Sequence, residues 1–98
     1  MREYAKVAPT IWTGTTGKQI RALGRNCQVL AFYLLTNPHA NMLGLYYLPL
    51  PIVAHETGIP LEEALEGLQR LSEVGFCAYD PPSEFVWVYE MARFQIGG

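Results

Sequence analysis

The fold is decided by residues 44–75, which read GLYYLPLPIVAHETGIPLEEALEGLQRLSEVG. The first five, Gly44–Leu48, are rich in aromatic and β-prone residues and predict a short strand. Pro51 suits the first position of a helix, and we expect that helix to run to Gly58. Gly58 is expected to adopt the left-handed backbone conformation of a tight helix–turn–helix connection.

The next helix is expected over residues 61–74, and it is the clearest amphipathic segment of the chain. Its apolar side chains recur every three or four positions, at Leu61, Ala64, Leu65, Leu68, Leu71 and Val74. Gly75 should end this helix. Beyond it we expect a hairpin, in which strands over Phe76–Tyr79 and Phe85–Tyr89 flank a loop that contains two prolines.

A central helix is expected before residue 44. Residues 25–36 are apolar on nearly every side, which is typical of a helix that other elements surround. Asn37-Pro38 should end this helix, because the residue before a proline avoids the α region.

The N-terminal part is expected to hold a short helix and an arm. The helix should span Gly17–Leu23, capped by Thr16 and ended by Gly24. Residues 4–12 should form an extended arm or an edge strand, since Pro9 lacks a backbone donor.

The resulting order is helix, strand, helix, turn, helix and two-stranded hairpin. It predicts an α+β fold of the winged helix-turn-helix class, with three or four helices and a small antiparallel wing sheet. Gly44–Leu48 would be the third strand of that sheet, and a different α+β arrangement is the alternative. We expect residues 1–92 to form a single domain with an N-terminal arm, and residues 93–98 to be a tail cut from a longer protein.

Composition excludes a disordered tail, because 50% of the 98 residues are hydrophobic and only 16% are charged. The net charge of −2 is unevenly distributed. Residues 1–40 contain five Lys and Arg residues and one Glu, whereas residues 41–98 contain two Arg residues and eight Asp and Glu residues. The split indicates either one end that faces nucleic acid and one that faces protein, or a local variation of surface composition.

No motif of an enzyme is evident. The segment Gly14–Gln19 resembles a phosphate-binding loop, but it lacks the first glycine and the final Ser or Thr of that motif. His39 and His55 lack a neighbouring nucleophile, and Cys27 and Cys77 stand apart from other metal ligands. We therefore expect no catalytic residue, no metal and no cofactor, with an enzyme of unrecognised site as a third hypothesis.

Cellular location follows from cysteine usage and hydropathy. Two unpaired cysteines fit a reducing cytosol, and the opening residues show no apolar leader. The longest apolar run, Val29–Leu35, is too short to cross a bilayer. We expect a cytoplasmic protein without membrane contact.

The candidates for DNA contact are the basic residues of the N-terminal half and one arginine of the second helix of the helix–turn–helix pair: Lys6, Lys18, Arg21, Arg25 and Arg70. In an ordinary winged helix that second helix enters the major groove. Here it carries four glutamates against Arg70 alone, at positions 62, 63, 66 and 73. Phosphates would repel it, so contact through the N-terminal half is favoured.

An aromatic set on the expected strands is the candidate for self-association: Tyr46, Phe85, Trp87 and Tyr89. Phe85, Trp87 and Tyr89 share one face of their strand, while Val86 and Val88 share the other. Because both faces are apolar, one should pack on the helices and the other should be covered by the N-terminal arm or by a partner chain. Core packing and a dimer contact are favoured over base stacking, because neither strand contains Lys or Arg.

Four segments carry a family resemblance, and they read VAPTIW at 7–12, QVLAFYLLTNP at 28–38, GLYYL at 44–48 and LQRLSEVGF at 68–76. Over residues 4–96 the chain resembles the N-terminal winged-helix domain of phage and prophage replication proteins, the replisome-organiser and DnaD-like group. The resemblance implies that the chain is one module of a longer protein and mediates self-association. It also implies that a further C-terminal region carries much of the binding to DNA or to a helicase loader.

Together, these residues and this resemblance predict a non-catalytic winged-helix module of a phage-type DNA replication protein in the host cytoplasm. It would act as a homo-oligomer and in interactions with replication proteins, with non-specific DNA contact through its basic N-terminal half. The alternative is a sequence-specific DNA-binding transcriptional regulator, in which changing Arg70 would abolish specific binding.

Overall fold

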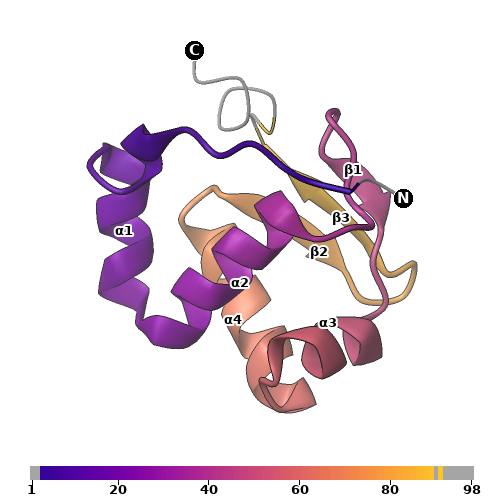
Figure 1. Ribbon diagram of the computed structural model, residues 1–98. Coiled ribbons are helices and arrows are strands. Elements are labelled where there is room, and N and C mark those ends of the chain that lie inside the picture. The colour runs from indigo at the N-terminus through magenta and orange to yellow at the C-terminus, as the bar shows by residue number, and fades with distance from the viewer. Residues whose placement is uncertain (1–2, 90, 92–98) are drawn as a thin grey trace.

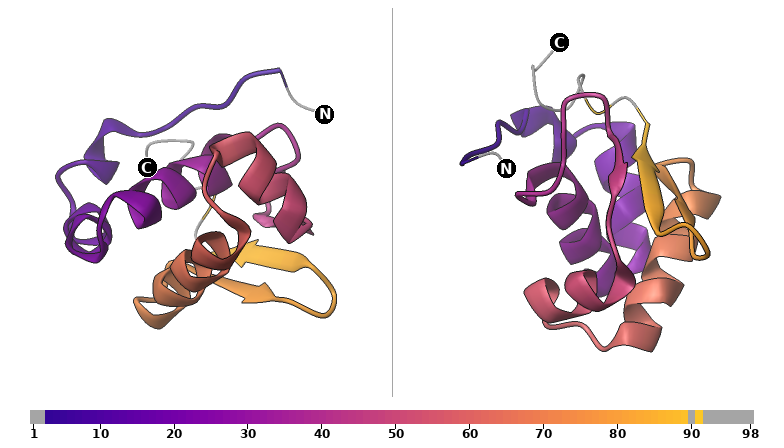
Figure 2. Two further views of the ribbon diagram at one scale, coloured as in Figure 1. Left: turned by 90° about the horizontal axis from the view of Figure 1, so that it is seen from below. Right: turned by 90° about the vertical axis from the view of Figure 1, so that its right-hand side faces the viewer.

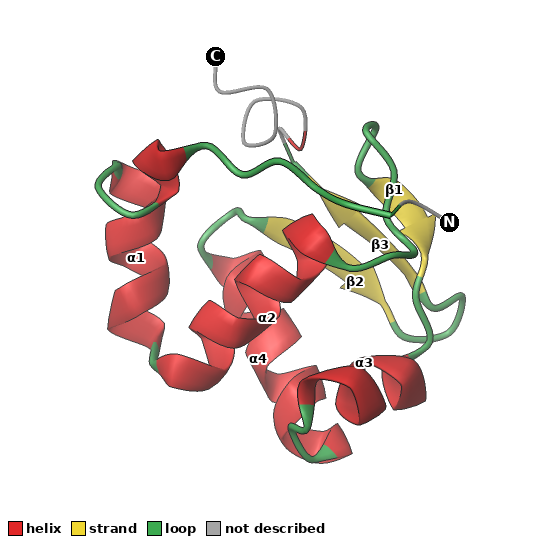
Figure 3. Cartoon of the chain, in the orientation of Figure 1, coloured by secondary structure: helices red, strands yellow, loops and turns green. Residues whose placement is uncertain are grey.

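Residues 3–89 and residue 91 are described by the computed structural model (Figure 1). Along the chain the elements are a 3-10 turn, two helices, a strand, two further helices and a hairpin: η1 Pro9–Ile11, α1 Thr15–Leu23, α2 Arg25–Thr36, β1 Leu45–Tyr47, α3 Leu50–Thr57, α4 Leu61–Glu73, β2 Cys77–Asp80 and β3 Phe85–Val88. None of the described helices is long and apolar enough to cross a membrane. The described residues form a small α+β fold, in which helices lie to one side of the sheet (Figure 3).

The sheet is antiparallel and has the order β1-β3-β2, so the short strand before α3 pairs with the last strand. Leu45 lies opposite Trp87, and Tyr47 lies opposite Phe85. The expectation that the strand around residues 44–48 joins the hairpin as a third strand is confirmed. Side chains alternate between the two faces, and the inner face turns buried residues toward the helices: Tyr46, Cys77, Val86 and Val88.

The core is built around α2, as its apolar surface predicts. Leu30, Leu34 and Leu35 are fully buried. At the crossing of α2 and α4, a Cβ added to Gly67 would lie 2.3 Å from Cδ1 of Leu30. The glycine therefore lets the two helices approach closely, and Leu68 beside it is fully buried.

The connection between α3 and α4 has the expected left-handed glycine. Gly58 has φ 77° and ψ 5°, and its N–H donates a hydrogen bond to the carbonyl oxygen of Ala54. Gly75, which follows α4, has φ 78°. One detail of the prediction is wrong, because α3 begins at Leu50 and Pro51 is therefore its second residue.

The first helix starts earlier than its sequence suggests. α1 begins at Thr15 with Gly14 as N-cap, and no side chain caps it, so the prediction of Thr16 as the cap is wrong. Gly17 lies inside the helix, where an added Cβ would be 1.7 Å from the carbonyl oxygen of Ile11. This glycine marks the place where α1 packs against the backbone of η1, not the start of a helix.

The edge strand expected for residues 4–12 is absent, and the extended arm is present only up to Ala8. Pro9 begins a 3-10 turn, in which the N–H of Ile11 donates to the carbonyl oxygen of Ala8 at 3.1 Å and the Ile11 side chain is buried. The turn forms because a proline is well placed at the first helical position and Ile11 enters the core. Both views in Figure 2 place the arm and the sheet on opposite sides of α2.

Candidate interaction surfaces

The outer face of the sheet is apolar and exposed. We define the outer sheet face as the half-exposed side chains of β1 and β3 that point away from the helices: Leu45, Tyr47, Phe85 and Trp87. The two strands bring them together in two cross-strand pairs, Leu45 with Trp87 and Tyr47 with Phe85. The ring centroids of Tyr47 and Phe85 are 5.8 Å apart, and Tyr89 extends the row with an edge-on contact to Trp87 at 4.8 Å.

Of the residues predicted for self-association, Phe85, Trp87 and Tyr89 lie on this side of the sheet, but Tyr46 does not. Tyr46 is only 5% exposed, and its hydroxyl donates to the carbonyl oxygen of Leu34 at 2.7 Å. The prediction of Tyr46 as an association residue is therefore wrong. Its neighbour Tyr47, 53% exposed, takes the place on the outer sheet face. The cause is the alternation of side chains along a strand, which makes adjacent tyrosines face opposite ways.

The outer sheet face is not covered by the arm. Residues 3–8 lie on the other side of α2 (Figure 2), and Trp87 is 52% exposed. Three half-exposed aromatic side chains present on the order of 300 Å² of surface. The loop before β1 adds Met42 and Leu43, the latter 83% exposed. A contiguous apolar area of this size is typical of an interaction site.

The predicted DNA-contact residues are exposed but do not form one group. Lys18 and Arg21 lie on α1 and Arg25 begins α2, whereas Lys6 lies on the arm that crosses α2. Nη1 of Arg21 donates to the carbonyl oxygen of Trp12 at 2.8 Å, which fixes the turn between η1 and α1. Lys18, Arg21 and Arg25 are therefore the basic residues that the fold holds on one pair of adjacent helices.

Arg70 is paired with an acidic side chain of its own helix. Its Nη2 lies 3.2 Å from Oε1 of Glu66, one turn earlier on α4. Arg70 and Arg25 line the same open hollow of about 450 Å³, but Glu63 and Glu66 line it as well. The mixture of charges makes this hollow a poor site for phosphate.

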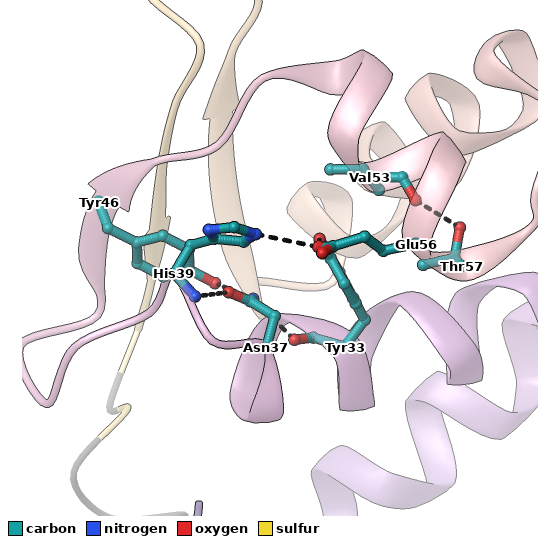
Figure 4. A network of polar contacts seen from close by, with 7 residues as sticks. All are labelled: Tyr33, Asn37, His39, Tyr46, Val53, Glu56 and Thr57. Atoms are coloured by element: carbon teal, nitrogen blue, oxygen red, sulfur yellow. Dashed lines mark hydrogen bonds and ion pairs between the residues drawn. The ribbon is translucent and has the colours of Figure 1, made fainter. Parts of the chain in front are cut away.

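A polar network that the sequence did not reveal joins α2, β1 and α3 (Figure 4). Oε1 of Glu56 accepts hydrogen bonds from the hydroxyl of Tyr33 and from Nε2 of His39, the latter at 3.0 Å. The amide of Asn37 accepts from the N–H of His39 at 2.9 Å and donates to the hydroxyl of Tyr46 at 3.0 Å. Glu56 lies 23 residues after Tyr33 and 17 after His39, and the set has no motif spacing, so the fold brings Glu56 to the other residues.

The network is structural, because its hydrogen bonds hold α2, β1 and α3 together. The hydrogen bonds from Tyr33 and His39 lower the pKa of Glu56, and burial together with the bond to Glu56 raises the pKa of Tyr33. The hydroxyl of Thr57 donates to the carbonyl oxygen of Val53 at 2.7 Å, so it is engaged within α3. No nucleophile with an adjacent base results from this arrangement of the drawn residues (Figure 4).

Acid should weaken the hydrogen bonds that Glu56 accepts from Tyr33 and His39. The pKa of Glu56 is lower in the folded protein than the usual 4.5, so its ionised form adds stability above the unfolded-state pKa, and this contribution is lost as the pH falls through the folded-state value. The difference in unfolding free energy between wild type and Glu56→Gln should therefore shrink between about pH 5 and pH 3. In an NMR titration, Tyr33→Phe should raise the pKa of Glu56; an unchanged pKa would contradict the assigned hydrogen bond.

The thiols and other metal-binding groups offer no further site among the described residues. Cys27 and Cys77 are buried and unpaired, and burial raises the pKa of Cys77 to about 12, which keeps it a protonated, unreactive thiol. Within residues 3–89 and 91, no three His, Cys, Asp or Glu side chains are grouped to hold a metal ion.

Comparisons of the chain with protein-family models, with curated proteins and with solved structures find no match. A functional assignment therefore depends on the surfaces of this molecule. Those surfaces are the apolar outer sheet face and the basic helices α1 and α2.

Proposed function

We propose that the chain is a winged-helix module that self-associates through the outer sheet face, as part of a phage-type replication protein. The order of elements and the strand order β1-β3-β2 support the winged-helix assignment. The sequence resemblance to replisome-organiser and DnaD-like domains supports the replication role. The single observation that carries self-association is the row of exposed aromatic side chains on the outer sheet face.

A second copy of this chain is the occupant that the face fits best. A two-fold interface brings the same patch of both copies together, so the patch must not repel itself. The four side chains of the outer sheet face carry no charge, and the neighbouring Ala78 of β2 is uncharged as well. Aromatic residues are also the side chains most enriched at the centres of protein interfaces.

The expected dimer is weak. Stable interfaces bury about 800 Å² per partner, which is more than the outer sheet face offers even with the loop at residues 42–43. We therefore expect a monomer–dimer equilibrium that depends on protein concentration. Other replication proteins could then occupy the same face in the monomer.

Reading of the major groove by α4 is disfavoured. Arg70, the residue that this alternative depends on, is paired with Glu66 of its own helix. Non-specific DNA contact by Lys18, Arg21 and Arg25 fits the charges better, because α1 and α2 contain no acidic residue.

Trp87→Ala should weaken the dimer at least about ten-fold, because an aromatic side chain at an interface centre contributes more than most others. Sedimentation velocity over a range of protein concentrations measures the change. Trp12→Ala is the matched control, since Trp12 is 56% exposed on a different surface. A wild-type protein that stays monomeric at every concentration, or an unaffected Trp87→Ala dimer, would overturn the proposal.

A further inference from the structure

We infer that the exposed Trp12 and its neighbours on α2 form a stacking site for the bases of single-stranded nucleic acid. Trp12, Gln28, Val29 and Phe32 line an open hollow of about 400 Å³. The proposal deepens one part of the proposed function, the DNA contact of the N-terminal half, and it rests on that part. It does not depend on self-association through the outer sheet face.

The aromatic part of the site is held by the fold. Trp12 ends the η1 turn, and its ring lies against that of Phe32 with centroids 4.9 Å apart and planes inclined by 31°. Despite this contact Trp12 is 56% exposed, and Val29 beside it is 46% exposed. A large aromatic ring that is fixed on one side and open on the other is the usual platform for an unpaired base.

The helices that carry the site also carry two arginines, Arg21 on α1 and Arg25 at the start of α2. The guanidinium of Arg21 is bonded to the carbonyl oxygen of Trp12 at 2.8 Å, so a positive charge lies at the base of the platform. Arg25 precedes Val29 by four residues on α2, which places both on one face of the helix. A phosphate beside the stacked base would therefore meet the guanidinium of Arg21, and Arg25 adds a second cation one turn before Val29.

Charge favours a polyanion over a basic or neutral protein as the occupant, and the exposed ring of Trp12 favours nucleic acid among polyanions. From residue 4 to residue 55 the sequence contains four basic residues and no acidic one. The outer sheet face, by contrast, has no Lys or Arg in its strands. The two exposed tryptophans thus differ in their nearest charges: the carbonyl oxygen of Trp12 accepts a hydrogen bond from Arg21, whereas the strand of Trp87 contains no Lys or Arg.

Single strands are preferred because their bases are open. In a duplex the base faces are stacked on one another and are closed to a side chain. The amide of Gln28 at the edge of the hollow offers hydrogen bonds to a base edge. Stacking is tolerant of sequence, so we expect little discrimination among bases.

The test is fluorescence anisotropy with a labelled oligothymidylate of roughly 15 nucleotides and with a duplex of the same length. Wild type should bind the single strand more tightly than the duplex, and raising the salt from roughly 50 to 200 mM should weaken binding about ten-fold. Trp12→Ala should weaken single-strand binding about ten-fold, whereas Trp12→Phe should keep most of it. Leu61→Ala, the matched control, shortens an apolar side chain that is 45% exposed at the start of α4, and it should bind as wild type does.

Two further measurements keep the test decisive if Trp12→Ala does not fold. Val29→Glu places a carboxylate at the exposed rim of the hollow and should weaken single-strand binding by a similar factor. In Trp87→Phe, Trp12 is the remaining tryptophan of the two in the chain, and the oligonucleotide should quench its emission.

Three outcomes would overturn the stacking site. One is equal binding of Trp12→Ala and wild type, and another is equal binding of duplex and single strand with Trp12 emission unchanged. The third is a Trp12→Ala variant that loses dimerisation instead of nucleic-acid binding, which would make this hollow a protein interface. Self-association is read separately by the sedimentation of Trp87→Ala, so either proposal can fail alone.

Discussion

Gly17→Ala is expected to destabilise the protein by about 3 kcal/mol. The same substitution at an ordinary helix position stabilises by about 1 kcal/mol, because alanine has the higher helix propensity. Here the new Cβ would lie 1.7 Å from the carbonyl oxygen of Ile11, and a backbone atom has no rotamer by which to move away. The η1 turn must therefore shift off α1 and take the buried Ile11 side chain with it.

Urea denaturation followed by circular dichroism measures this effect. The matched control is Gln19→Ala, two residues later on the exposed side of α1, which should leave the midpoint unchanged or raise it. A Gly17→Ala protein that is as stable as wild type would show that η1 and α1 do not pack as described.

Tyr46→Phe should cost about 2 kcal/mol, the second largest effect that we expect from a single substitution. Its hydroxyl donates to the carbonyl oxygen of Leu34 near the end of α2. Pro38, four residues after Leu34, has no N–H with which to continue the helical hydrogen bonds. Phenylalanine would leave a buried carbonyl without this donor and would also remove one of the two acceptors that the Asn37 amide nitrogen has, the other being the carbonyl oxygen of Tyr33.

Tyr47→Phe is the natural control, because the two tyrosines are adjacent and chemically identical. The Tyr47 hydroxyl lies 3.3 Å from Oε1 of Glu84 on the exposed side of the sheet, and its loss should change stability by less than about 0.5 kcal/mol. Equal effects of the two substitutions would mean that the register of β1 is not the one described here.

The larger elements could be predicted because local signals agree with the global fold. The bounds of α2, Arg25–Thr36, follow from an apolar segment that a glycine precedes and Asn37-Pro38 ends. The α3–α4 turn follows from Gly58, whose positive φ a residue with a Cβ rarely adopts. In such places the neighbouring residues alone contain the necessary information.

The errors have the opposite origin, in contacts between distant parts of the chain. Whether Tyr46 or Tyr47 faces inward depends on the register of β1 against β3, and a three-residue strand has too short a pattern to fix it. Gly17 has the sequence signature of a helix boundary, yet it lies within α1 because of its contact with η1. The pairing of Trp12 with Phe32 spans two turns and a helix, so no local spacing indicates it.

The separation of the two proposed surfaces determines how the module would behave when joined to its own copy. The η1 turn and α1 lie at the end of the molecule away from β1 (Figure 1), so pairing of the outer sheet faces leaves both hollows open. A dimer would then be a bivalent ligand, and once one hollow holds a strand, the second meets that strand at a high effective concentration. Weak contacts at each surface would reinforce one another, and long strands would be held far more tightly than short ones.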